Sequence, residues 1–448
     1  MKKVFYKKLL SLVLPIAFQQ FMLSLVSASD ALMLGFISQD ALSAVSLAGQ
    51  VMFVFNLFLT AFSMGTSMMA AQYWGKGDKE AVEKILAFVL RASLAVSFVF
   101  FIGTLCFPRL LMSVFTSEQR LIAGGVVYLQ ASSVSYLLCG ISQIYLCIMK
   151  NSGHAVKSTV ISSTAVILNI VLNALLIFGP GEIPAFGIAG AAYATTIARA
   201  VEMIWAVLDS AKPNSIRLHL KFFFHTDKSL EKTYWKYSLP FLGNELAWGC
   251  GFTMYSVVMG HMGSDAVAAN SIANIAKNLM ICFCIGIANG GSILVGNELG
   301  AGRLAQAREY GGKLCRLSIA GGAASGALLL LCSPLILRFA GLGAQAEEYL
   351  KWMFFICSYY LIGKSINTTT IGGIFSAGGD TRFGLICDTI TLWFVTVPMG
   401  CIAAFVLNWP VLAVYFVLNL DEIVKLPAVY KHYKEYRWVQ NLTQIADS

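Results

Sequence analysis

Residues 9–38 have the sequence LLSLVLPIAFQQFMLSLVSASDALMLGFIS, with one charged side chain, Asp30. A helix of about 20 apolar residues crosses a bilayer core, so this stretch predicts a membrane-spanning helix. It follows MKKVFYKK directly and is too long for the apolar part of a cleavable signal peptide. A lone carboxylate in a span is costly, which makes Asp30 a candidate functional residue. The alternative is an acid at the outer helix end, since about 20 residues at ~1.5 Å each already reach the outer interface.

The composition extends this interpretation to the whole chain. Of the 448 residues, 57% are hydrophobic and 12% are charged, whereas a soluble domain carries about 25% charged residues. With a mean hydropathy of +0.71, the chain is expected to be a multi-pass membrane protein. The net charge of +9 follows from membrane topology and does not indicate nucleic acid. The 11 Cys lie mostly in apolar runs and show no metal-ligand spacing with the five scattered His.

Nucleotide-driven and enzymatic functions are not expected. Gly363-Lys364-Ser365 is similar to the end of a P-loop, but Ser358 stands where the loop requires an earlier Gly. The sequence contains no nucleotide-binding domain, so transport would use an ion gradient, and we expect no cofactor. An aqueous loop with a nucleophile and a base is also missing from the sequence, which argues against an enzyme.

The hydropathy pattern predicts an all-α integral membrane protein of twelve spans. With the N-terminus inside, 25 of the 32 Lys and Arg fall in inner segments. This bias follows the positive-inside rule and predicts cytoplasmic termini. We expect a six-helix lobe over 1–208, a cytoplasmic loop over 209–234, and a second six-helix lobe with a cytoplasmic tail over 235–448. The predicted spans are 9–37, 45–73, 86–107, 126–148, 158–178, 187–208, 235–262, 270–296, 314–333, 349–373, 383–406 and 410–427.

The two predicted lobes repeat each other in sequence. At a fixed offset of 225 residues, twelve of the 63 positions from Pro15 onward are identical, including paired Pro, Asp and Gly. Because six spans is an even number, the halves enter and leave on the same side and are parallel repeats. Such repeats are typical of secondary transporters. The identical pairs are Pro15/Pro240, Gly35/Gly260, Asp40/Asp265, Ala41/Ala266, Ala44/Ala269, Ser46/Ser271, Ala48/Ala273, Phe58/Phe283, Gly65/Gly290, Ser67/Ser292, Gly75/Gly300 and Gly77/Gly302.

Motifs along nearly the whole chain point to one family. Asp30 lies in SDALMLG, which is similar to V-D-T-x-x-x-G, and AAQYWGKGDKEAVEK (70–84) pairs with VGNELGAGRLAQARE (295–309). SAGGDTRFG (376–384) is similar to G-x-G-D-T-R, with KNSGHAVK (150–157) as a degraded copy. LNIVLNALLIFG (168–179) and GIAGAAYATTIAR (187–199) match a fifth and a sixth helix. In order and spacing, these motifs resemble the multidrug and toxic compound extrusion (MATE) family of the multidrug/oligosaccharidyl-lipid/polysaccharide flippase superfamily.

The resemblance implies a two-lobed exporter that exchanges Na⁺ or H⁺ for substrate, with a cation site in the N-terminal lobe. Carried over by position, the coupling residues are Asp30, Asn169, Asn173 and Thr195. The i,i+4 spacing of the two Asn places them on one helix face. Carboxylate, amide and hydroxyl oxygens suit a hard cation such as Na⁺ at Asp30, Asn169 and Asn173, or a proton on the Asp. Some relatives have a second Asp in place of Asn173, so the coupling ion stays open.

Other charges within the spans are candidates for a substrate site or a second coupling site. Glu245 lies near mid-membrane and either binds cation or substrate or pairs with Lys277. Asp388 either serves such a site or pairs with Lys364. Arg199 and Glu202, at i,i+3, are expected to form a structural ion pair. The inner helix end that carries Asp421, Glu422 and Lys425 is expected to be solvated or internally paired. Met and aromatic side chains, individually more consistent with packing, would suit a permissive cavity: Met22, Phe53, Phe58, Met254, Tyr255 and Met280.

These observations predict a secondary active antiporter that exports amphiphilic, often cationic, organic compounds by alternating access. The expected partners are a small organic substrate and membrane lipid, without nucleic acid or nucleotide, and the expected state is a monomer in a bacterial inner membrane. The alternative is a lipid-linked precursor flippase of the same superfamily, which Arg199, Lys277 and Lys364 favour. A passive channel is disfavoured by the internal repeat.

Overall fold

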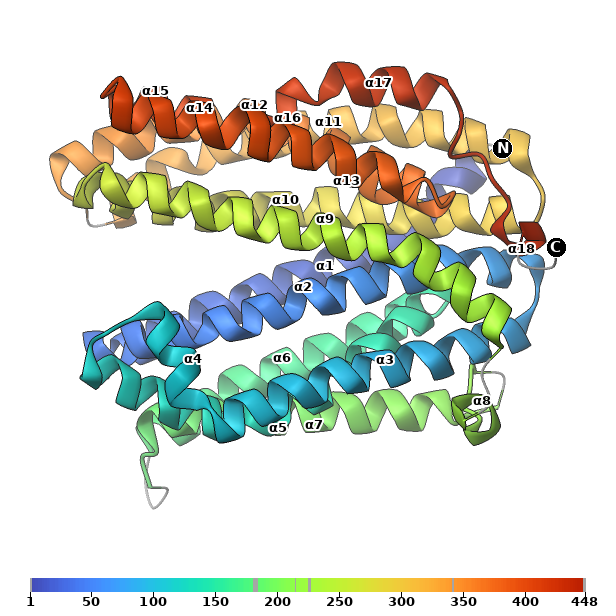
Figure 1. Cartoon of the computed structure of the whole chain (residues 1–448), viewed down its shortest axis with the longest axis horizontal. Coiled ribbons are helices and arrows are strands. Elements are labelled where there is room, and N and C mark those ends of the chain that lie inside the picture. The colour runs from blue at the N-terminus through green and yellow to red at the C-terminus, as the bar shows by residue number, and fades with distance from the viewer. Residues whose placement is uncertain (1, 180–183, 214, 225–226, 341, 446–448) are drawn as a thin grey trace. The chain divides into compact units, whose positions relative to one another are not determined.

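The protein, analysed as a computed structural model, is built from helices in two compact units (Figure 1). The structure describes residues 2–179, 184–213, 215–224, 227–340 and 342–445. One unit comprises Met1–Gln20, Ala71–Gly77 and Trp235–Ser448, and the other comprises Phe21–Ala70 and Asp78–Tyr234. We call the first the C-terminal unit and the second the N-terminal unit.

The first half of the chain forms long helices joined by short turns. In the N-terminal unit, α5 packs against α3 and α7, and α6 packs against α7 (Figure 1). Helices α3, α5, α6 and α7 contain no internal proline. An uninterrupted helix pairs its internal N–H and C=O groups within itself, as a membrane requires. The helices are α1 (Lys2–Gly35), α2 (Gln39–Lys76), α3 (Lys79–Cys106), α4 (Pro108–Phe115), α5 (Gln119–Asn151), α6 (Ala155–Phe178), α7 (Gly187–Ser210) and the short α8 (Leu220–Phe224).

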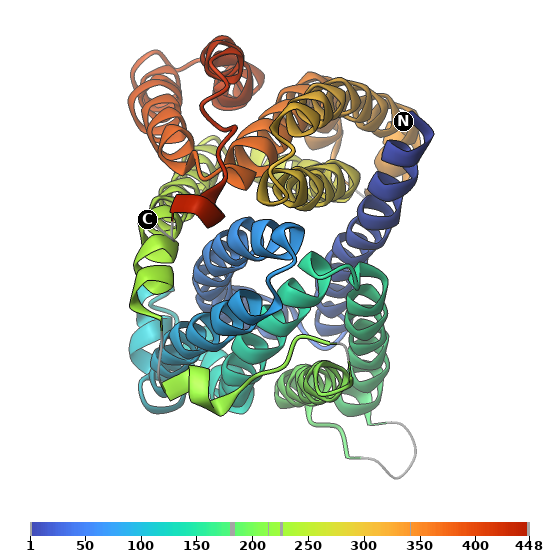
Figure 2. The same ribbon diagram turned by 90° about the vertical axis from the view of Figure 1, so that its right-hand side faces the viewer.

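The second half repeats the first and then becomes irregular. Helices α10, α11 and α12 pack against one another in the C-terminal unit, and Figure 2 shows the helices close to end-on. Regular α-helix gives way to π-helix three times after Asn367, in η1, η2 and η3. The elements are α9 (Lys228–His261), α10 (Ser264–Gly300), α11 (Leu304–Ala340), α12 (Ala344–Asn367), η1 (Thr368–Phe375), α13 (Thr381–Thr389), η2 (Ile390–Thr396), α14 (Val397–Cys401), η3 (Ile402–Val406), α15 (Val411–Leu418), α16 (Asp421–Val424), α17 (Leu426–Lys434) and α18 (Leu442–Ile445).

The repeat seen in the sequence is also present in the backbone. Helices α1 and α9 are both 34 residues long, and each contains a proline, Pro15 or Pro240. The turns that follow α2 and α10 place Gly77 (φ +86°) and Gly302 (φ +75°) in the left-handed region, where glycine carries no steric penalty. The two halves therefore correspond in helix length and in turn conformation as well as in sequence.

A second pair of left-handed glycines supports the degraded motif copy. Gly153 (φ +82°) and Gly379 (φ +79°) each precede the N-cap of a helix, and the N-cap residues are His154 and Asp380. In both turns the N-cap N–H donates to a carbonyl five residues earlier, at 2.8 Å from Met149 O and 3.0 Å from Phe375 O. KNSGHAVK thus keeps the turn of SAGGDTRFG although its side chains differ.

Within the described residues, nine helices are long and apolar enough to cross a membrane. The other three predicted spans fall on α9, on α12 with η1, and on the broken segment of α15 and α16. These three segments are the more polar or interrupted ones. Helix α9 carries Glu245 and α12 carries Lys364. Helix α15 is only eight residues long and ends before Asn419.

Candidate functional site

The four coupling residues expected from the sequence meet in the N-terminal unit. Asn173 donates from Nδ2 to Asp30 Oδ1 at 2.5 Å and to Asn169 Oδ1 at 3.2 Å. Asn169 in turn donates from Nδ2 to Thr195 Oγ1 at 3.2 Å, and Thr195 donates to Ala191 O at 3.0 Å. The chain of hydrogen bonds therefore links α1, α6 and α7 through the polar groups that the sequence singled out.

Helix geometry explains why these residues converge. Asn169 and Asn173 lie one turn apart on α6, so their amides stack on one face. Both are buried, and Asp30 is half-buried five residues before the end of α1. Asn173 is fully buried, and its Oδ1 has no hydrogen-bond partner in the described part of the chain. A buried oxygen without a partner is unfavourable. The donor set of carboxylate, amide and hydroxyl oxygens therefore fits a small hard cation or a proton on Asp30.

The expected ion pair on α7 is confirmed. Arg199 Nη1 lies 2.8 Å from Glu202 Oε2, and Ser142 on α5 donates to the same oxygen at 2.9 Å. Glu202 is almost fully buried, and the guanidinium supplies the counter-charge that a buried carboxylate needs. Arg199 is thereby occupied within the N-terminal unit.

The C-terminal unit contains a set of alternating charges, two buried and two half-buried, which we call the C-terminal charge cluster. It consists of Lys364, Glu422, Lys425 and Asp388. Lys364 Nζ lies 3.0 Å from Glu422 Oε1, and Lys425 Nζ lies 3.1 Å from Glu422 Oε2 and 2.8 Å from Asp388 Oδ1. Asn367 adds a hydrogen bond to Glu422 Oε2 at 2.8 Å. Two lysines and two acids from α12, α13, α16 and the residue after it therefore neutralise one another.

This cluster corrects two of the alternatives drawn from the sequence. Pairing of Asp388 with Lys364 is wrong, because Asp388 binds Lys425 and Lys364 binds Glu422. For the inner end at 421–425, internal pairing is confirmed by the Glu422–Lys425 ion pair. The solvated alternative is wrong, because Glu422 is fully buried and Lys425 is 5% exposed. The sequence contained one signal for the true pairing, the i,i+3 spacing of Glu422 and Lys425.

Glu245 and Lys277 are not an ion pair with each other. Among the residues that the structure describes, no ion pair or hydrogen bond is made by the Glu245 side chain, which is half-buried on α9. Lys277 on α10 is half-buried, and its Nζ lies 3.5 Å from Asn419 Oδ1 and 4.5 Å from the centroid of the Tyr360 ring. Both are therefore ionisable side chains without a charged partner in direct contact.

Irregular backbone and buried charge coincide in the C-terminal unit. Helix α12 ends at Asn367, three residues after Lys364, and the π-helix η1 follows it. Helix α13 ends at Thr389, one residue after Asp388, and the π-helix η2 follows it. The third charged segment begins where α15 ends and α16 starts. Single π-helical insertions often mark functional sites. Sequence reasoning missed these breaks because it relied on hydropathy; Gly372 and Gly373 in η1 and Pro398 after η2 were the available signals.

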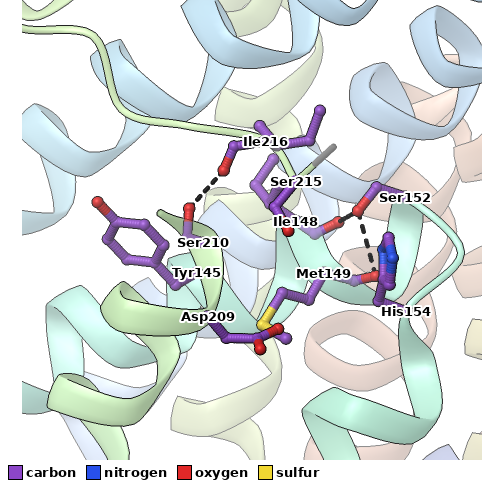
Figure 3. A pocket seen from close by; sticks show the side chains of 9 residues that line it. All are labelled: Tyr145, Ile148, Met149, Ser152, His154, Asp209, Ser210, Ser215 and Ile216. Carbon is purple, nitrogen blue, oxygen red and sulfur yellow. Dashed lines mark hydrogen bonds between the residues drawn. The ribbon is translucent and has the colours of Figure 1, made fainter. Parts of the chain in front are cut away.

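A small pocket in the N-terminal unit lies away from all candidate residues (Figure 3). It is located where α5 ends, α6 begins and α7 ends. Ser152 donates to Ile148 O at 2.9 Å, and Ser210 donates to Ile216 O at its rim. The acid of the pocket, Asp209, is neutralised by Lys212 at 2.5 Å and Lys157 at 3.6 Å. Asp209 and the two serine hydroxyls thus have partners, and none of the candidate site residues lines the pocket. The lining residues are Tyr145, Ile148, Met149, Ser152, His154, Asp209, Ser210, Ser215 and Ile216.

Comparison with known sequences decides the family. The MatE family model matches residues 15–175 and again 241–402, one match in each half of the chain. The chain belongs to the MatE family. The two matched MatE segments begin 226 residues apart, in agreement with the offset of the internal repeat.

Relatives of similar length accompany this MatE match. The chain is 24% identical to the "Uncharacterized transporter YisQ" of Bacillus subtilis over 442 residues, covering 96% of this chain and 95% of the relative. It is also 24% identical over 412 residues to the "Probable multidrug resistance protein NorM" of Bacillus cereus, covering 90% and 89%. This MatE protein therefore matches transporters along nearly their whole length.

Solved structures agree with the fold. The chain superposes with a TM-score of 0.88 at 18% identity on a crystal structure of MATE in complex with MaL6, covering 96% of each chain. It superposes with a TM-score of 0.87 at 18% identity on the outward-facing conformation of a multidrug resistance MATE family transporter of the MOP superfamily, covering 96% of this chain and 95% of the other. The expected fold class, twelve membrane helices in two six-helix bundles related as parallel repeats, is confirmed. The protein is a multi-pass membrane transporter of the MATE family.

Proposed function

We propose that this MATE transporter exports amphiphilic organic compounds in exchange for H⁺ or Na⁺ by alternating access. Several relatives are probable multidrug resistance proteins, which supports export of small organic substrates. The observation that carries the ion coupling is the hydrogen-bonded chain from Asp30 through Asn173 and Asn169 to Thr195. It joins three helices of the N-terminal unit at one carboxylate.

Asp30 is the group whose occupancy changes in the proposed cycle. When Asp30 is ionised, the Asn173 amide donates to it and α1 is tied to α6. A proton on the carboxylate, or a Na⁺ held by Asp30 and the Asn oxygens, replaces or weakens that bond. The packing of α1 against α6 then differs between the two forms. If ion and substrate prefer opposite sides of the alternating-access equilibrium, a coupling free energy of about 1–3 kcal/mol suffices.

The protein is proposed to act as a monomer in a bacterial inner membrane, with both termini in the cytoplasm. The excess of Lys and Arg in inner segments supports that orientation. Membrane lipid is then the only other partner required. The test is a cysteine introduced near Ser448 in a variant whose eleven native Cys are replaced, labelled with an impermeant maleimide. A cytoplasmic C-terminus predicts labelling only after lysis.

The flippase alternative is less well supported by the geometry. Three cations favoured it in the sequence, Arg199, Lys277 and Lys364. Arg199 is neutralised by Glu202 and Lys364 by Glu422, so two of the three are unavailable for a phosphate without breaking an ion pair. Accumulation of a lipid-linked substrate on one leaflet in a deletion strain would restore this alternative.

The test of the proposed function is efflux of a fluorescent cationic dye from reconstituted vesicles, with ΔpH and ΔNa⁺ imposed separately. Wild type is expected to respond to one gradient, which identifies the coupling ion. Asp30→Asn is expected to abolish the response, whereas Asp40→Asn, at an exposed acid near the start of α2, is the matched control and is expected to retain it. Gradient-driven efflux that survives Asp30→Asn contradicts coupling at Asp30. No efflux under either gradient contradicts the export proposal.

A further inference from the structure

Lys277 lies inside the membrane span of α10 and is not part of the C-terminal charge cluster. Lys364 and Lys425 each have a carboxylate oxygen within 3.1 Å. In the described part of the chain, no carboxylate oxygen lies within 4.0 Å of Lys277 Nζ. A buried or half-buried ammonium in a membrane span normally has a counter-charge, and an exception is a candidate functional group.

The immediate surroundings of Lys277 are neutral and preorganised. Its ammonium lies 4.5 Å from the centroid of the Tyr360 ring, a cation–π distance. The second contact, 3.5 Å to Asn419 Oδ1, is at the long limit of a hydrogen bond. Asn419 is itself held by donation from Nδ2 to Tyr415 O at 2.8 Å. These contacts position the ammonium but leave most of its three donors without a strong acceptor.

Apolar residues flank Lys277 along α10. Ala273 and Ala276 are buried in the hydrophobic core of the C-terminal unit, and Met280 packs against that core. Lys277 itself remains half-buried, so the charged end is not sealed off completely. An ammonium within apolar surroundings combines the two features that recognise an amphiphile with an acidic group: one point charge and an adjacent apolar surface.

Asp421 is the obvious internal partner, and it is not in contact. It lies two residues beyond Asn419 and is 3% exposed. Its carboxylate interacts with Lys277 only through space, and Oδ1 has no hydrogen-bond partner among the described residues. The two unpaired opposite charges thus remain separate, although an ion pair between them would satisfy both.

We propose that Lys277 is the counter-ion for an acidic group, such as a carboxylate, on the exported compound. This inference rests on the proposed export function and names the substrate class: amphiphiles that carry an acid, including zwitterions, in addition to simple organic cations. The ammonium binds the acid of the substrate, the Tyr360 ring and Asn419 hold the ammonium in place, and the adjacent core residues contact the apolar part.

The test uses two dyes that differ in one group. Rhodamine 110 has a free carboxylate, and rhodamine 123 is its methyl ester. Binding of each dye to the purified full-length protein in detergent is measured by fluorescence anisotropy. Wild type is expected to bind rhodamine 110 more tightly than rhodamine 123. Lys277→Gln is expected to weaken rhodamine 110 binding at least tenfold and to leave rhodamine 123 within twofold.

Two further variants serve as controls. Lys277→Arg keeps the charge and is expected to retain the preference for the carboxylate dye. Lys351→Gln removes an exposed lysine of α12 and is expected to change neither affinity. Each variant is accepted if it elutes at the volume of the wild type and unfolds in a single cooperative thermal transition.

Three results overturn the proposal. Equal binding of both dyes by wild type, or binding of neither, removes the preference for an acid. An equal effect of Lys277→Gln on both dyes indicates a structural role. A loss of thermal stability in Lys277→Gln that Asp421→Asn restores, with rhodamine 110 binding unchanged throughout, identifies Lys277 as an internal counter-charge. If rhodamine 123 still shows gradient-driven efflux, any of these results contradicts only the proposed recognition of an acidic group by Lys277. The proposed export function is then still supported.

Discussion

Replacing Glu422 by Gln removes the central acid of the C-terminal charge cluster while keeping its shape. Glu422 is fully buried, with Lys364 at 3.0 Å and Lys425 at 3.1 Å. Each pair gains about 5 kcal/mol of attraction at 3 Å if the effective dielectric constant is about 20. Lys425 keeps Asp388 at 2.8 Å after the substitution, but Lys364 loses its acidic partner. Removing one partner of a buried ion pair costs about 3–5 kcal/mol, and the ammonium left here, on Lys364, is half-buried.

We therefore expect Glu422→Gln to lose about 3–5 kcal/mol of unfolding free energy. The assay is unfolding of the detergent-solubilised protein in SDS, followed by the fluorescence of its eight Trp. The matched control is Glu80→Gln, which removes an exposed i,i+4 partner of Lys84 at 3.0 Å and is expected to cost only about 0.3–0.5 kcal/mol. The two substitutions differ in burial but not in chemistry.

A compensating variant separates charge from shape. Adding Lys364→Met to Glu422→Gln removes the uncompensated charge and is expected to recover most of the lost free energy, because apolar replacement of a buried pair is often neutral. The electrostatic reasoning is refuted if Glu422→Gln loses less than about 1 kcal/mol, no more than a surface pair contributes, or if the double variant is less stable than the single one.

Three other predictions concern the backbone and the inner helix ends. In Gly300→Ala the new Cβ would lie 1.8 Å from Gln72 O, so we expect the free energy of unfolding to fall by about 2–3 kcal/mol. In Gly49→Ala the new Cβ meets nothing within 4 Å, and the free energy of unfolding is expected to rise by about 0.5–1 kcal/mol in the same assay. Gln72→Ala removes the acceptor of the Leu442 amide (2.7 Å), so hydrogen exchange of a peptide that spans residues 438–445 should accelerate; unchanged exchange would show that the tail is held otherwise. Asp78→Ala removes the N-cap bond to Ala81 N–H (3.0 Å) and should cost about 1 kcal/mol, a loss that Asp78→Ser largely avoids.

The N-terminal site was predictable because its signal lies within single helices. The isolated charge at Asp30 and the i,i+4 spacing of Asn169 and Asn173 are both visible in the sequence, and the resemblance to the MATE family supplied Thr195. In the structure, the packing of α1, α6 and α7 brings these side chains together. Their hydrogen bonds follow from that packing.

The C-terminal charges were harder to pair because their partners come from segments that are not regular helices. Asp388 precedes η2, and Lys425 follows the four-residue α16, so neither position has a helical register that could be projected from hydropathy. Lys364 and Asp388 lie on consecutive predicted spans, which suggested that they pair; this prediction was wrong, because Asp388 pairs with Lys425. Burial of Glu422 was missed for the same reason, since charged residues at the end of a span usually face water.

Three helices are divided between the two compact units. The C-terminal unit takes α1 up to Gln20 and the Ala71–Gly77 end of α2, and the N-terminal unit takes the start of α9 up to Tyr234. A chain cut between α8 and α9 would therefore give two pieces, neither of which carries the complete residue set of either unit. Two such polypeptides can regain the native structure only by exchanging these segments when they are produced together.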